Sequence, residues 1–154
     1  MKILIVITSL FICTFHSSAG YNSPDKTDTS RYAIFKLSDD PTLFDKDSKP
    51  AKLSKLEINR VEKLIDNEVN NYNKKSKEDW QIRKPHSYRQ QMIAAINKKG
   101  EKEIWVHCFR GISTTDFNWR KNLIVIEDGG TDVFQIKINL TLNKVYYFRV
   151  NGIA

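Results

Sequence analysis

Hydrophobic residues in the middle of the chain recur with a helical period. The apolar side chains are Leu56, Val61, the adjacent pair Leu64 and Ile65, Val69 and Tyr72, and apart from that pair they are spaced by three to five residues. Such spacing gathers side chains on one face of a helix. Ser54 and Glu57 form a capping box at its start, and Leu53 and Ile58 form a hydrophobic staple. The pattern predicts an amphipathic α-helix over Lys55–Asn73.

From about residue 86 onward the pattern is that of β-strands. Val133–Leu140 alternates between apolar and polar side chains, which is typical of a strand with one buried face. Other apolar runs predict strands at Arg31–Leu37, Tyr88–Asn97, Glu103–Phe109, Trp119–Glu127 and Val145–Val150. Asp128-Gly129-Gly130 predicts a tight hairpin, because glycine adopts the positive φ that such turns need.

These elements follow the order β-α-β-β-β-β-β. Successive hairpins build an antiparallel meander with one apolar face. A single helix buries its apolar stripe most economically against that face. We therefore predict an α+β fold, in which one long helix packs on an antiparallel β-meander and residues 31–154 form a single domain.

The N-terminus has the pattern of a secretory signal peptide. Lys2 precedes the apolar run Ile3–Phe15, and Ser17-Ser18-Ala19 supplies small residues for cleavage. We predict a signal peptide at 1–19, cleaved after Ala19 or Gly20, and a flexible leader at 20–30. The apolar run is shorter than the roughly 20 residues of a membrane span. The mature chain is therefore expected to be periplasmic or extracellular, without a transmembrane segment.

Two cysteines bear on processing and redox chemistry. Cys13 lies near the end of the apolar run and offers a lipid anchor as an alternative, which is disfavoured because the bulky Ile12 precedes it. Cleavage after Ala19 would remove Cys13 and leave Cys108 without an intrachain disulfide partner.

The order of one strand, one long helix and then several antiparallel strands, over Arg31–Val150, is similar to the cystatin-like architecture. Inhibitory cystatins resemble one another in a Gln-x-Val-x-Gly hairpin, which the corresponding hairpin Asn97–Glu101 lacks. Their second, Pro-Trp hairpin is also absent from Asp128–Gly130 and Thr141–Lys144. The resemblance implies the fold and not the inhibition.

The C-terminal part is similar to small exported proteins of Bacteroidota-type bacteria. The segments that carry this likeness are Trp119-Arg120-Lys121, Asp128-Gly129-Gly130 and Val150–Ala154. The likeness implies no particular activity.

Candidate catalytic groups are few. His107 and Cys108 are adjacent, but neighbouring residues of a strand point to opposite faces, so His107 cannot activate the thiol. Cys108 shares its face with Ile104 and Val106, which favours a buried core cysteine. The candidate carboxylates are Asp116, Glu127, Asp128 and Asp132, and the first three could serve a hydrolase. No spacing of His and Cys matches a metal site. We predict no catalytic residue, cofactor or metal.

Charge and aromatic residues suggest a binding surface. The chain has 25 basic and 18 acidic residues, a net charge of +7. Trp105, His107 and Phe109 share one strand face, which is a binding surface if open and core if covered. The candidate surface, combining basic and aromatic side chains, consists of Trp80, Arg83, Lys84, Tyr88, Arg89, Trp105, His107 and Phe109.

The sequence thus favours an exported, non-enzymatic binding module. Its expected partner is an unknown protein or an anionic component of the cell envelope. The predicted export disfavours a nucleic-acid partner. The alternatives are a protease inhibitor on the cystatin-like scaffold, or a small hydrolase or thiol enzyme that uses Cys108 or the carboxylates of Asp116, Glu127 and Asp128.

Overall fold

A computed structural model describes residues 29–111 and 118–152. The predicted signal peptide at 1–19, most of the leader at 20–30, Cys13, the cleavage site at Ala19 or Gly20, and Asp116 lie outside the described residues. The described part has these helices and strands: β1 (Tyr32–Phe35), β2 (Lys49–Pro50), α1 (Lys55–Asn73), β3 (Arg89–Ile96), β4 (Lys102–Phe109), β5 (Val133–Asn139) and β6 (Lys144–Val150). The protein is therefore α+β, with one helix and a sheet of six strands in the described residues.

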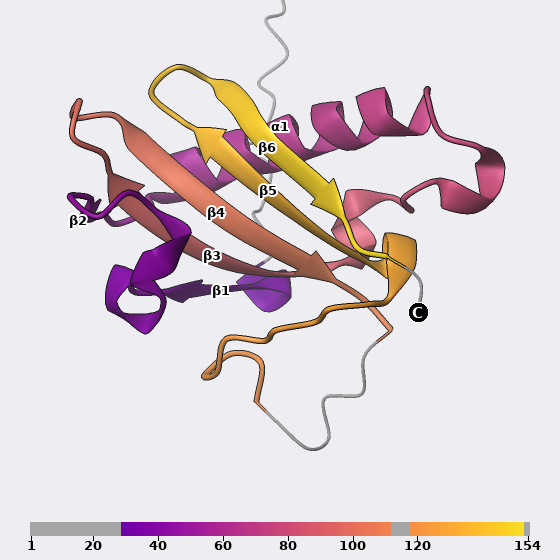
Figure 1. Cartoon of the computed structure of the whole chain (residues 1–154), viewed down its shortest axis with the longest axis horizontal. Helices are drawn as coiled ribbons and strands as arrows, with labels where there is room; N and C mark the ends of the chain where they lie inside the picture. The colour runs from indigo at the N-terminus through magenta and orange to yellow at the C-terminus, as the bar shows by residue number, and fades with distance from the viewer. Residues whose placement is uncertain (1–28, 112–117, 153–154) are drawn as a thin grey trace, which may run out of the picture.

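The sheet is mixed rather than an antiparallel meander. Its strands lie in the order β1-β3-β4-β5-β6, and the short β2 also pairs with β3 (Figure 1). β1 runs parallel to β3, which corrects the antiparallel prediction, while β3, β4, β5 and β6 pair antiparallel in sequence. The reason is the crossover: α1 carries the chain back along the sheet, as a connection between parallel strands must.

The sequence locates four strands closely and predicts one that the structure lacks in the described residues. β3, β4, β5 and β6 agree with prediction within one residue at each end, and α1 agrees at both ends. The strand predicted at Trp119–Glu127 is absent. This segment is instead a loop that lies on the sheet. The predicted hairpin at Asp128-Gly129-Gly130 is also wrong. Gly129 has a φ of 96° and precedes the 3₁₀ turn Gly130–Asp132, which leads into β5.

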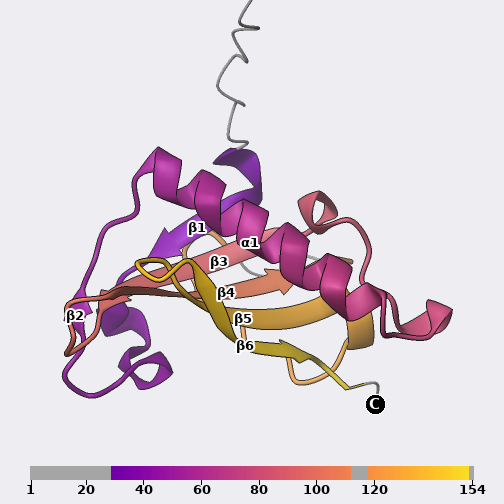
Figure 2. The same ribbon diagram turned by 90° about the horizontal axis from the view of Figure 1, so that it is seen from above.

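The helix lies across one face of the sheet, as Figure 2 shows from above. Four helical side chains are buried against the strands: Ile58, Val61, Ile65 and Val69. Leu56, included in the predicted stripe, is 77% exposed. It lies five positions before Val61, which places it well off the buried face at 3.6 residues per turn.

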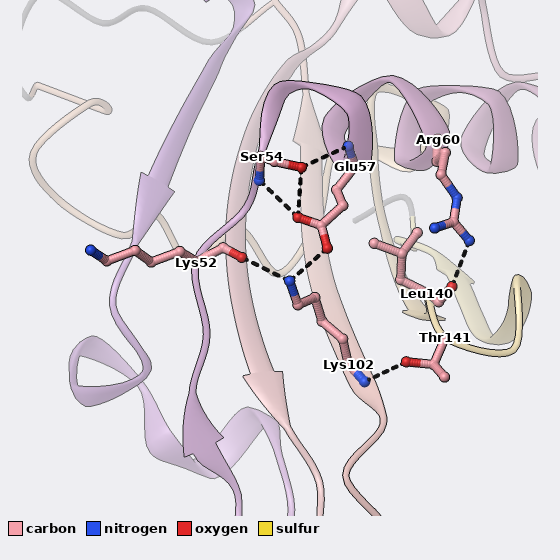
Figure 3. A network of polar contacts seen from close by, with 7 residues as sticks. All are labelled: Lys52, Ser54, Glu57, Arg60, Lys102, Leu140 and Thr141. Carbon is pink, nitrogen blue, oxygen red and sulfur yellow. Dashed lines mark hydrogen bonds and ion pairs between the residues drawn. The ribbon is translucent and has the colours of Figure 1, made fainter.

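A polar network fixes the start of α1 (Figure 3). The capping box is confirmed: the Ser54 amide donates to Glu57 Oε2 at 2.8 Å, and the Glu57 amide donates to Ser54 Oγ at 3.3 Å. Lys102 Nζ, from β4, donates to Glu57 Oε1 at 2.6 Å and to the Lys52 carbonyl at 3.1 Å. Arg60 donates to the Leu140 carbonyl at 2.7 Å, so α1 is also tied to the end of β5.

The second face of the sheet is covered by loops instead of a helix. Residues 118–127, called the strap below, place Trp119 and Ile124 against Phe109 and Val133. The segment after β1 adds Leu37 against Ile93 and Trp105 in a neighbouring cluster.

The Gln91 side chain holds the strap in place. It donates to the carbonyls of Trp119 and Asn122 at 2.6 and 2.7 Å, and it accepts from the Ile124 amide at 2.9 Å. Gln91 thus satisfies three backbone groups of the strap, which therefore need no strand partner in the sheet.

Candidate functional site

The chain leaves α1 through a basic arm, residues 74–84, which is anchored at a single apolar point. Ile82 is buried in the helix-side core. The side chain of Asn73 makes two hydrogen bonds to the backbone of Ile82: Nδ2 donates to the Ile82 carbonyl at 2.8 Å, and Oδ1 accepts from the Ile82 backbone amide at 2.8 Å. The arm therefore has a fixed base, and Figure 2 shows it projecting beyond the end of α1.

The arm carries exposed cations beside an exposed indole. Trp80 lies in the 3₁₀ turn Glu78–Trp80 and is 43% exposed. The exposed basic side chains of the arm are Lys74, Lys75, Lys77, Arg83 and Lys84. Against these five cations stand two acidic residues, Glu78 and Asp79, so the arm has a net charge of +3. The structure thus brings together three residues of the predicted surface, Trp80, Arg83 and Lys84.

The other five residues of the predicted surface point elsewhere. Tyr88 is buried, and its hydroxyl donates to the Thr131 carbonyl at 2.7 Å. Arg89 is half-buried with its guanidinium 5.6 Å from the centre of the Trp119 ring. Trp105, His107 and Phe109 are all buried. This row is core even though α1 covers the opposite face, because the strap and the segment after β1 cover it.

His107 is buried, and neither of its ring nitrogens has a hydrogen-bond partner within the described residues. Its ring stacks on Trp105, with the centroids 5.7 Å apart and the planes 5° from parallel, and it contacts Phe109 on the other side. Burial lowers the pKa of His107 from 6.5 to about 4. The imidazole is therefore neutral near pH 7.

Cys108 lies in the core on the opposite face, as its strand position predicts. It is completely buried in the cluster beneath α1. Burial raises the pKa of its thiol well above the ordinary value, and the Glu62 carboxylate raises it further. Because the thiolate is the nucleophile, this environment opposes thiol chemistry.

An open hollow lies between the arm and the turn before β5, and sequence reasoning missed it. Its volume is about 860 Å³. The charged side chains that line it are Glu78, Asp79, Arg83, Arg110, Asp128 and Asp132. Arg110 Nε contacts Asp132 Oδ1 at 2.6 Å. The hollow joins residues about 50 positions apart, which no local sequence pattern reveals.

The proposed hydrolase carboxylates are only partly placed. Asp128 lines the hollow and Glu127 is exposed outside its lining. Within residues 29–111 and 118–152, no group of three or more His, Cys, Asp or Glu side chains could hold a metal ion. Over the same residues, no helix is long and apolar enough to cross a membrane.

No protein-family model, curated protein or solved structure matches this chain.

Proposed function

We propose that the protein is an exported binding module whose basic arm contacts the anionic lipid surface of the cell envelope. The observation that carries the proposal is the position of Trp80, 43% exposed on an arm with five exposed basic side chains. The proposal of export is supported by the apolar run Ile3–Phe15 and the small residues before Gly20.

The chemistry of the arm suits a lipid headgroup region. Lys and Arg near an anionic membrane each contribute about 1 kcal/mol of attraction. An indole favours the interface, because its apolar body and its N–H match the two sides of that boundary. The other two tryptophans, Trp105 and Trp119, are buried, so Trp80 is the tryptophan placed to make this contact.

The cystatin-like architecture also remains a proposal. One long helix across the antiparallel strands β3 to β6 supports it, whereas the parallel pairing of β1 with β3 departs from a pure meander. A thiol enzyme is less well supported, because Cys108 is buried under α1.

Vesicle sedimentation tests the lipid contact with a charge-matched control. Lys74→Gln combined with Lys75→Gln removes two charges from the arm. Lys98→Gln combined with Lys99→Gln removes two exposed charges from the β3–β4 turn. We expect the first pair to weaken binding to phosphatidylglycerol vesicles by about tenfold or more, and the second pair to change it by less than about twofold.

Salt and lipid composition give two further readouts. Binding should fall as salt is raised, because the Debye length shortens, and vesicles of phosphatidylcholine alone should bind weakly. Equal losses from both variant pairs would show that net charge, rather than the arm, is responsible, and would refute the proposal.

A further inference from the structure

The sheet ends at β6, and in the described part of the chain no strand pairs with its outer edge. Figure 1 shows β6 at the rim of the sheet, beyond β5. An edge strand presents unpaired backbone N–H and C=O groups, which can pair with another chain.

The hydrogen bonds of β6 show which of its backbone groups face outward. The Asn151 amide donates to the Val133 carbonyl at 3.0 Å, just past the end of the strand. Backbone groups of an antiparallel strand alternate between its two sides. Those of Arg149 and Tyr147 therefore face β5, and those of Val150 and Phe148 face outward.

The two faces of β6 differ in chemistry. Phe148 and Val150 are half-buried and pack against the helix-side core, where the Phe148 and Tyr72 rings lie 5.6 Å apart. Tyr147 and Arg149 are exposed on the opposite face. There, Lys137 Nζ lies 5.9 Å from the centre of the Tyr147 ring. Lys137 Nζ also donates to the Leu43 carbonyl at 2.6 Å, so Arg149 is the exposed cation that β6 itself places on this face. This face is thus aromatic with an exposed arginine, whereas the helix side offers an apolar rim.

Charge complementarity indicates the kind of partner. β6 contains two basic residues, Lys144 and Arg149, and no acidic residue. A second copy of β6 would bring only further positive charge to this edge. A strand with acidic residues would instead meet the exposed Arg149 with opposite charge, which favours its binding and its register.

We propose that β6 accepts an extended segment of a partner protein as an additional strand, with acidic and apolar residues in alternation. Its acidic side chains lie beside Arg149, its apolar side chains lie along the rim at Phe148 and Val150, and its main chain pairs with the outward groups of these two residues. This interaction is independent of the lipid contact proposed for the basic arm.

A labelled, N-acetylated peptide of alternating Glu and Val tests the proposal on the full exported chain. Binding is measured by fluorescence anisotropy, and protection is measured by amide hydrogen exchange. We expect the peptide to slow exchange at Phe148 and Val150. We expect Arg149→Glu to weaken binding by about tenfold or more.

Two further variants separate the edge from general charge effects. Lys98→Glu makes the same charge reversal at the distant β3–β4 turn and should change binding by less than about twofold. Val150→Pro removes an outward N–H, which an edge strand tolerates, and should weaken binding. The thermal melts of Arg149→Glu and Lys98→Glu should match the parent, so that the difference between these two variants reports on the edge.

Four results would overturn the proposal. They are the absence of peptide binding, equal losses from Arg149→Glu and Lys98→Glu, preference for an alternating Lys and Val peptide, and unchanged exchange at Phe148 and Val150 with peptide bound. Self-association of the chain that protects the same two amides would assign the edge to a second copy instead.

Discussion

At the scale of single residues, two polar side chains on the strap side of the sheet have contrasting environments. Gln91 makes three hydrogen bonds to the strap backbone. His107, its cross-strand neighbour, is buried with both ring nitrogens unpaired within the described residues. The amide therefore organises the strap, whereas the imidazole is tolerated beneath it only as a neutral ring.

His107 predicts a specific loss of stability in acid. Its pKa is about 4 in the folded protein against 6.5 ordinarily, so the unfolded chain binds the extra proton first. Stability should be unaffected by this group above about pH 6.5 and should fall by about 3 kcal/mol as the pH drops to about 4, with little further loss below.

Urea unfolding of the parent and of His107→Phe across this pH range checks the prediction. Phenylalanine fits the stack between Trp105 and Phe109 and cannot be protonated, so the variant should lose most of the acid dependence between about pH 6.5 and about pH 4. If the variant and the parent lose stability in parallel, the buried imidazole is not the cause.

At the scale of elements, α1 depends on the network at its N-terminus. Burial raises the pKa of Glu57, but the hydrogen bonds from Lys102 and Ser54 outweigh this effect and hold the pKa at about 2, below its ordinary 4.5. Stability from Glu57 is therefore fully present above about pH 4.5 and is lost as the pH falls through about 2. The acid dependence due to Glu57 thus begins where that of His107 ends.

Ser54→Ala should lower the free energy of unfolding by about 1 kcal/mol near neutral pH, because it removes the cap of the Glu57 amide. Denaturant unfolding measures this loss. Lys55→Ala, at an exposed neighbouring position, is the matched control and should change stability by less than about 0.5 kcal/mol. A similar loss in both variants would contradict a role for the cap.

The same scale shows what the sequence could predict. α1 was predictable because its cap and its apolar period are local signals within Ser54–Asn73. The apolar run Leu123–Ile126 predicts a strand, but three backbone groups of the strap are instead satisfied by Gln91, more than 25 positions earlier in the chain. The parallel pairing of β1 with β3 depends on the path of the whole crossover, which the local periodicity of hydrophobic residues does not encode.

The candidate site also combines residues that are close in sequence with residues that only the fold brings together. Trp80, Arg83 and Lys84 lie on one arm because they are neighbours in sequence. Trp105, His107 and Phe109 were correctly placed on one face, yet the cover over that face comes from segments far away in the chain. The hollow beside the arm was missed because Arg110 and Asp132 meet Glu78 and Asp79 only in the folded protein.

At the scale of the whole molecule, the net charge of +7 is distributed unevenly. The basic arm carries +3 at one end of α1, and the cationic strand β6 forms the rim of the sheet. The buried groups, Cys108 and His107, are enclosed on opposite faces of β4. Neither of these two groups is therefore accessible at the surface.

Quenching of tryptophan fluorescence by brominated lipids tests the proposed lipid contact most directly. Vesicles of brominated phosphatidylglycerol should quench part of the emission of the parent protein, and Trp80→Phe should abolish this quenching while leaving the emission of the buried Trp105 and Trp119 unchanged. Quenching that persists in Trp80→Phe, or binding to these vesicles without any quenching of Trp80, would contradict the assignment of the arm as the lipid-binding surface.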